Sequence, residues 1–210
     1  MRISTLFILG ILIPFFAFGK VRLPAIFSDY LVFQQQSGNP IWGWAEPGEK
    51  VTVSTTWGSK ESVMAGEDGS WKVISYTQEP GVGHEVSIQG SNQIVLKEVA
   101  VGEVWLCAGQ SNMGWSTGNS FEADGELEVN LPDFRIFRSA REHWHEPLEE
   151  NRDRLACWKP CNPKSAAETS AVAYYFGKTL QQKLGVPVGI IQRAYAGTPI
   201  EGWMPWGIQR

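Results

Sequence analysis

The sequence predicts an α/β protein with an N-terminal antiparallel β-sandwich, followed by an incomplete, doubly wound parallel sheet. Short strands separated by glycine-containing turns fill residues 20–99, which is typical of a small all-β domain. From about Ala100 the pattern changes to strands that alternate with helical segments. This order favours parallel strands joined by right-handed helical crossovers. We therefore expect domains over residues 20–99 and 100–210, after a leader over residues 1–19.

The leader has the features of a secretory signal peptide. Arg2 supplies a positive charge, Leu6 to Phe16 form an apolar stretch, and Ala17-Phe18-Gly19 places small residues near a cleavage site. The alternative, a membrane anchor, needs about 20 apolar residues, and this stretch is shorter. We expect a secreted or periplasmic protein with no stable membrane association after cleavage.

Turn signals divide the predicted sandwich into strands. In Glu46-Pro47-Gly48-Glu49 the Pro-Gly pair suits the centre of a type II turn. The expected turns are 46–49 between strands 41–45 and 50–55, 66–70 between strands 61–65 and 71–75, and 90–92 between strands 85–89 and 93–99. This part contains no nucleophile with a base, no acid pair and no metal-ligand set, so we expect it to have a structural or positioning role.

The second half is expected to begin with a strand over 101–108, and the apolar pattern of Val104 to Ala108 predicts that this part of the strand is buried. A segment with helical potential follows around Glu122 to Asn130, and a second strand is expected over 134–137. Residues 138–164 form a long, charged connection, and connections of this length are usually functional or disordered.

A helix and a third strand close the predicted order. Ser165-Ala166-Ala167-Glu168 matches a capping box, although Ser170 is an alternative helix start. Gly185 and Pro187 end the helix, and a strand over 188–191 follows. Four apolar residues lie on one face of this helix, as in an amphipathic helix: Val172, Phe176, Leu180 and Leu184.

Composition excludes several classes of partner. The net charge is −4, so the chain lacks the basic surface expected for binding nucleic acid. No phosphate-binding glycine loop occurs, and we expect no cofactor. The ten tryptophans suit either a sandwich core or a sugar-stacking surface, and the core is the favoured reading.

The three cysteines predict no metal site. Cys107 lies in the first strand of the second half, where a free thiol behaves as a small apolar group. Cys157 and Cys161 are close enough in sequence for a short-loop disulfide in an oxidising compartment. A zinc site needs two more ligands at suitable spacing, and none is near.

Ser111 is the candidate nucleophile. The strand stops at Gly109, and chemistry in open α/β sheets takes place beyond the carboxyl ends of the strands. The N–H groups of Ser111 and Asn112 would lie at the start of a helix, where donors without intrahelical partners can hold an oxyanion. Spacing alone leaves an alternative, because serine is also a favoured helix-capping residue.

Gly109-Gln110-Ser111-Asn112-Met113 resembles the nucleophile block of the SGNH (GDSL-like) hydrolases, in the form found in sialate O-acetylesterases and related acetylxylan esterases. The resemblance extends in family order from about Leu23 to Trp203. It is carried by further blocks: Leu23 to Asp29, Trp42 to Val51, Ser170 to Gly177, Leu184 to Gly189, and Gly197 to Trp203.

The resemblance implies a carbohydrate O-acetylesterase in which Ser111 attacks the acetyl ester, with Gln110 and Asn112 in support. Family members carry a Trp-Gly-Gly-Thr block that contributes an oxyanion-hole N–H, and this chain has Tyr195-Ala196-Gly197-Thr198 instead. Ala196 or Gly197 would supply the donor. If the family backbone needs a positive φ at Ala196, strain of about 1 to 2 kcal/mol follows.

Family members also continue to an Asp-x-x-His block that has no counterpart here. The histidines of the chain are His84, His143 and His145, and none is placed beside Ser111 by a motif. The chain resembles the N-terminal portion of the family, so we expect the 210 residues alone to expose an apolar sheet edge and to have negligible esterase activity. The expected substrates are acetylated sialate sugars, then acetylated xylan or another glycan. The alternatives are a non-catalytic glycan-binding protein and a non-functional fragment.

Overall fold

The computed structural model describes residues 20–121, 123, 125, 127–138, 148 and 156–208. Its strands are β1 (Val32–Gln34), β2 (Gly38–Trp44), β3 (Lys50–Thr55), β4 (Lys60–Met64), β5 (Ser70–Tyr76), β6 (Gly81–Gln89), β7 (Gln93–Gly109), β8 (Leu131–Arg138), β9 (Cys157–Cys161) and β10 (Val188–Ala194). The α-helices are α1 (Ser111–Gly114), α2 (Pro163–Glu168) and α3 (Ala171–Leu184), and short 3₁₀ helices occupy Thr117–Asn119, Ile200–Trp203 and Trp206–Ile208. The predicted mixed α/β class is confirmed.

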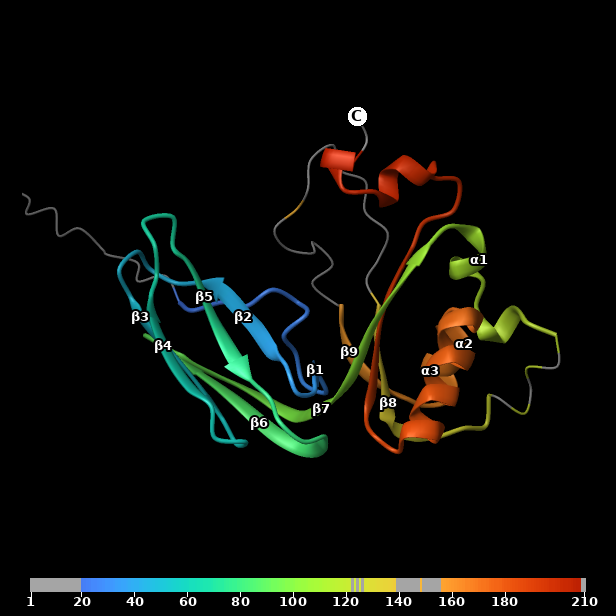
Figure 1. The fold of residues 1–210 in the computed structure, drawn as a ribbon, viewed down its shortest axis with the longest axis horizontal. Coiled ribbons are helices and arrows are strands. Elements are labelled where there is room, and N and C mark those ends of the chain that lie inside the picture. The colour runs from blue at the N-terminus through green and yellow to red at the C-terminus, as the bar shows by residue number, and fades with distance from the viewer. Residues whose placement is uncertain are drawn as a thin grey trace, which may run out of the picture.

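One long strand, β7, runs through both halves of the molecule (Figure 1). Its first part pairs antiparallel with β6, and its last part, Glu103 to Gly109, pairs in parallel with β10. The large sheet has the order β4-β3-β6-β7-β10-β8-β9, and β1 also pairs with β7. The predicted domain boundary near Val99 therefore falls inside a continuous strand. We call residues 20–99 the N-terminal β unit and residues 100–208 the α/β unit.

In the N-terminal β unit, the two-stranded sheet β2–β5 packs against the large sheet. Strand alternation puts Ile41 and Val73 of the small sheet in one buried cluster with Val51 and Ile88 of β3 and β6. The expected turn at 46–49 is present, with Gly48 at φ +75° and Glu49 N–H donating to the Glu46 carbonyl at 2.9 Å. Of the three expected turns, only 90–92 joins strands that pair with each other, because β2 and β5 pair together and not with the strands that precede or follow them across the other two turns.

In the α/β unit, β7, β10 and β8 run parallel, and β9 is an antiparallel edge strand. The described helices α1, α2 and α3 cover one face of these strands (Figure 1). On the opposite face, Phe137 and Trp158 pack with β1 and the N-terminal β unit. Trp158 Nε1 also donates to the Ile26 carbonyl at 2.8 Å, which ties the two units together.

The burial predicted for Val104 to Ala108 is wrong, although the strand itself is present. Cys107 is buried on the helix-covered face, as expected, but Trp105 and Leu106 are 43% and 67% exposed. The reason is the edge of the sheet: β10 pairs with one side of this part of β7, and no described strand pairs with its other side.

The packing face predicted for α3 is confirmed only at Leu180, which is partly buried against the hydrophobic cluster of the α/β unit. Val172, Phe176 and Leu184 are exposed, and the buried residues are Ala173, Tyr174 and Gly177. The helix lies so close to the sheet that a Cβ at Gly177 would be 2.5 Å from the Phe134 ring. The contact face therefore combines two small residues with the fully buried Tyr174, and the exposed apolar residues lie outside it.

Helix starts differ partly from the prediction. The capping box of α2 is formed by Asn162 and Ser165, not by Ser165 and Glu168, so that helix begins earlier and ends at Glu168. Ser170 caps the separate helix α3, which agrees with the alternative prediction that a helix starts at Ser170. The helix expected around residues 122–130 lies partly outside the described residues. Within the described part, Leu127 N–H donates to the Ala123 carbonyl, which marks a single helical turn.

The disulfide that the spacing of Cys157 and Cys161 made possible is not formed in the structure. The two residues lie at opposite ends of β9. At about 3.3 Å per residue, four steps along a strand separate their Cα atoms by about 13 Å. A disulfide requires Cα atoms less than about 7 Å apart.

Candidate active site at the ends of β7 and β10

The candidate nucleophile is exposed at the carboxyl end of a parallel strand. β7 ends at Gly109, and Ser111 is the first residue of the short helix α1. Gln110 is the N-cap, and its carbonyl accepts the Gly114 N–H at 3.0 Å. Within the described residues, the Ser111 hydroxyl and the N–H groups of Ser111 and Asn112 make no hydrogen bonds. A hydroxyl and two backbone donors are thus available at one place.

The second predicted block lies beside the first. Ala194 is the register partner of Gly109, and the Tyr195 N–H donates to the Gly109 carbonyl at 2.9 Å. The exposed residues Ala196 and Gly197 follow at once in the loop after β10. Because parallel strands end at the same edge of the sheet, their loops meet there. Segments more than 80 residues apart in sequence are therefore neighbours.

The backbone of the loop after β10 shows whether alanine at position 196 is strained. Gly197 has φ +75°, whereas Ala196 is not among the described non-glycine residues with positive φ. The left-handed position is thus occupied by the residue that tolerates it, and the replacement of glycine by Ala196 introduces no such strain. The Thr198 hydroxyl donates to the Tyr195 carbonyl at 2.9 Å and accepts the Trp203 indole N–H at 2.8 Å, which stabilises the loop.

Buried residues that the sequence reasoning missed hold α1 in place. Gln192 of β10 is 7% exposed, and its side-chain oxygen accepts the Ser170 N–H at 2.9 Å. The Ser170 hydroxyl lies 3.3 Å from the Met113 sulfur of α1. The Trp115 carbonyl accepts the Ala171 N–H at 2.8 Å. The available signal was a single glutamine directly after the apolar run Val188 to Ile191.

The titratable groups near this site are few within the described part of the chain. Cys107 lies under the helices, where burial raises the pKa of its thiol and keeps it neutral. His84 lies on β6 in the N-terminal β unit, with Nδ1 3.1 Å from the Thr56 hydroxyl. His143 and His145 lie outside the described residues. Within the described residues, no group of three or more histidine, cysteine, aspartate or glutamate side chains is arranged to hold a metal ion. Among the same residues, no helix has the length and apolar composition of a membrane span.

Comparison with known proteins identifies the family. The family model described as carbohydrate esterase, sialic acid-specific acetylesterase, matches residues 101–209, which include the ends of both β7 and β10. The chain belongs to this family. The predicted resemblance to sialate O-acetylesterases is thereby confirmed. The predicted site residues fall within the part of the chain that the family model matches: Gln110, Ser111, Asn112, Ala196 and Gly197.

Individual relatives agree with this membership. The chain is 30% identical to mouse sialate O-acetylesterase over 200 residues, covering 87% of this chain and 37% of that protein. It is likewise 30% identical to the human sialate O-acetylesterase over 195 residues, covering 84% of this chain and 37% of the relative. Its fold is similar to that of a carbohydrate acetylesterase from Xanthomonas citri, with a TM-score of 0.83 and 31% identity over 89% of this chain and 43% of that one. The chain therefore spans less than half the length of each of these acetylesterases.

Proposed function

We propose that this chain carries the nucleophile of a carbohydrate O-acetylesterase that removes acetyl groups from sugars, and that Ser111 is this nucleophile. The observation that carries the proposal is the Tyr195–Gly109 hydrogen bond, which brings the loop of Ala196 and Gly197 beside the exposed Ser111. Acetylated sialate sugars are the first expected substrate, because the family and the relatives carry that name. Acetylated xylan or another acetylated glycan is the second.

The chemistry is acyl transfer in two steps. The Ser111 oxygen attacks the acetyl carbon while a base takes its proton, and the sugar hydroxyl leaves with a proton. Water then attacks the acetyl-serine, releasing acetate and restoring the serine hydroxyl. Both steps place negative charge on the acetyl oxygen. The backbone N–H groups of Ser111, Ala196 and Gly197 are the proposed donors, and losing one such donor typically costs about 3 to 4 kcal/mol in the transition state.

The proton acceptor is part of the proposal. His84 is the one histidine in the described residues, and it lies in the N-terminal β unit in contact with Thr56 and Trp57. We assign the base to a group outside the described residues. The proposal also includes three features of the whole chain. We propose that the sheet of the α/β unit is a doubly wound sheet of the SGNH type, that the N-terminal β unit is a sandwich, and that residues 1–19 direct export.

The test is acetate release from O-acetylated sialic acid and from acetylated xylan. The protein encoded at the native locus is expressed and compared with two variants, Ser111→Ala and Ser120→Ala. Ser120 is a serine in the same segment, so its replacement is the matched control. Ser111→Ala should lower acetate release by at least about 10³-fold, because removing a serine nucleophile disables the whole catalytic unit. Ser120→Ala should leave it unchanged. Full acetate release by a folded Ser111→Ala variant would contradict the proposal.

A further inference from the structure

A polar pocket lies in the N-terminal β unit, away from Ser111. It has a volume of about 410 Å³ and is lined by Gln36, Ser37, Gly38, Tyr76, Thr77, Gln78 and Glu79. This volume lies within the range of about 300–1,000 Å³ that is usual for small-molecule sites. The pocket forms where β2 begins and β5 ends, whereas α1 lies at the far end of β7 (Figure 1). It is therefore separate from the candidate active site.

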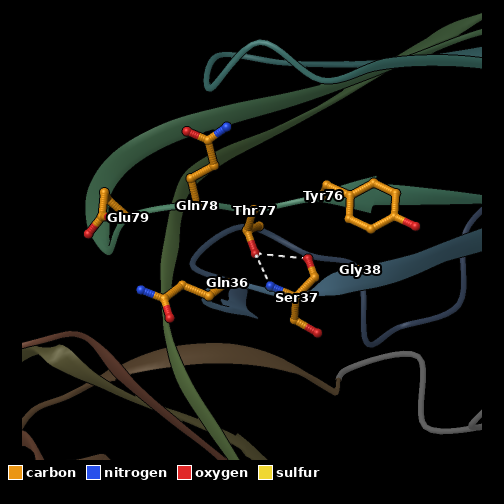
Figure 2. A pocket seen from close by; sticks show the side chains of 7 residues that line it. All are labelled: Gln36, Ser37, Gly38, Tyr76, Thr77, Gln78 and Glu79. Atoms are coloured by element: carbon orange, nitrogen blue, oxygen red, sulfur yellow. Dashed lines mark hydrogen bonds between the residues drawn. The ribbon is translucent and has the colours of Figure 1, made fainter.

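The floor of the pocket is a rigid hydrogen-bonded network. The Thr77 hydroxyl is buried and donates to the Gln34 carbonyl at 2.6 Å. The buried Asn39 amide donates to the Thr77 oxygen at 3.1 Å and to the Gln34 carbonyl at 3.0 Å. Figure 2 shows the Thr77 hydroxyl between the N–H and the carbonyl of Ser37. Since these groups satisfy one another, the floor is preorganised before any ligand arrives.

The Tyr76 ring forms an open aromatic platform on this floor. Its residue is 69% exposed. The ring lies across Gly38, its register partner on β2, and a Cβ added at Gly38 would be 3.1 Å from the ring. The Trp57 indole N–H donates to the Tyr76 carbonyl at 3.1 Å and fixes the backbone there. One side of the ring is thus supported by a glycine that has no side chain, and the other side is open to a ligand.

Polar side chains at the rim of the pocket are available for hydrogen bonds to a ligand. The side chains of Gln36, Gln78 and Glu79 make no hydrogen bond or ion pair within the described residues, and Figure 2 shows Gln36 and Glu79 extending to the same side of the pocket. Gln36 is also held at φ +49°, a left-handed conformation that is unusual for a non-glycine residue. Such conformations persist where the surrounding structure enforces them and cluster at binding sites.

We propose that this pocket binds a neutral part of the glycan, with one sugar ring stacked on Tyr76 and hydroxyls of the adjoining sugar bonded to Gln36 and Gln78. Figure 2 shows the Tyr76 ring and the Gln36 side chain extending to opposite sides of Thr77, so two neighbouring sugars fit this spacing. An aromatic face suits the apolar C–H face of a pyranose, and side-chain amides both donate to and accept from hydroxyls. Glu79 is the one charged lining residue, so an acidic sugar is disfavoured. The class of ligand rests on the proposed function, but the site does not require Ser111.

The test is saturation-transfer NMR with methyl β-galactoside, and with the methyl glycoside of N-acetylneuraminic acid as the anionic comparison. Binding of the galactoside to the purified chain should be detectable at a ligand concentration of about 10 mM. Tyr76→Ala should raise the dissociation constant by about tenfold, or about 1.4 kcal/mol. Tyr76→Phe should retain binding, as should Phe121→Ala, which removes an aromatic that is 89% exposed elsewhere. Circular dichroism verifies that each variant is folded.

Two further variants complete the test. Glu79→Gln keeps the shape of the rim and should bring the affinity for the acidic glycoside closer to that for the neutral one. Ser111→Ala should bind the galactoside as the unchanged chain does. This result is expected whether or not esterase activity depends on Ser111, so the failure of one proposal can be told from the failure of the other. Absence of binding to the galactoside, tighter binding of the acidic glycoside, or undiminished binding by folded Tyr76→Ala would each overturn the proposal.

Discussion

The Tyr195 N–H donates to the Gly109 carbonyl across 2.9 Å, and this bond joins the ends of two parallel strands. It places the loop that begins at Ala196 beside the turn that exposes Ser111. The bond is backbone to backbone, so it depends on strand register and not on which side chains occupy the two positions. Side chains can thus change in the two loops while the relation between the proposed nucleophile and the proposed donors is kept.

Gly177→Ala should destabilise the protein, although alanine is the better helix former by about 1 kcal/mol. A Cβ at this position would be 2.5 Å from the Phe134 ring and 3.1 Å from Ile190, so either α3 or the sheet must shift. Overpacking of this kind costs about 1–3 kcal/mol. Thr179→Ala, at an exposed position of the same helix, is the control and should stabilise slightly. Urea unfolding measures both, and a more stable Gly177→Ala variant would show that the close approach is wrong.

Arg135→Met should lower the free energy of unfolding by more than about 3 kcal/mol, since bonds to a charged group are each worth about 1.5–3 kcal/mol. Arg135 is 3% exposed, and its guanidinium donates to the Tyr30 carbonyl at 3.1 Å and to the Glu98 carbonyl. These carbonyls belong to residues held at positive φ, 66° for Tyr30 and 53° for Glu98. The arginine thus binds the α/β unit to the N-terminal β unit.

Arg138→Met is the matched control for this experiment. Arg138 lies on the same strand, but its side chain is 45% exposed in its ion pair with Glu168. Exposed pairs contribute about 0–1 kcal/mol, so this variant should change stability little. Equal losses in the two variants, measured by urea unfolding, would contradict the role assigned to Arg135.

Stability should fall as the pH decreases below 6.5, in part because of His84. Burial lowers the pKa of His84 below the ordinary value of 6.5, and its ring faces the Thr56 hydroxyl and the Trp57 ring. Between 6.5 and the lower folded pKa, the unfolded chain binds a proton at His84 that the folded chain does not bind. The contribution is therefore complete above 6.5 and is lost below it. His84→Gln should show a shallower decline of unfolding free energy over this window, and an identical slope would rule out His84 as a source.

Local sequence signals predicted the strands and turns well. Alternation identified the strands around Val51, Val73 and Ile88, and Pro47-Gly48 identified its turn, because these features depend on neighbours in sequence. Pairing was not predictable in the same way. β2 and β3 are consecutive and joined by a tight turn, yet β2 pairs with β5 and β3 pairs with β4 and β6. Which strands pair depends on the core they enclose together.

Burial was the property predicted least well. Val172 and Phe176 are apolar at helical spacing, but they are exposed because Ala173 and Gly177 allow the close contact with Phe134. Leu106 is exposed because one edge of β7 has no described neighbour beyond Gly102. Periodicity identifies a face, whereas only the arrangement of the other elements decides whether that face is covered.

The sequence by itself determined the mixed α/β class, the family, and the position of Ser111 two residues after the glycine that ends a strand, since these follow from residue type and short-range order. The tertiary structure decided which distant groups meet: Tyr195 with Gly109, Gln192 with Ser170, and Tyr76 with Gly38. It also separated Cys157 from Cys161, although only three residues lie between them. The physical reason is that backbone conformation is set by neighbours in the chain, whereas contact is set by strand register and by the packing of elements brought together from far apart.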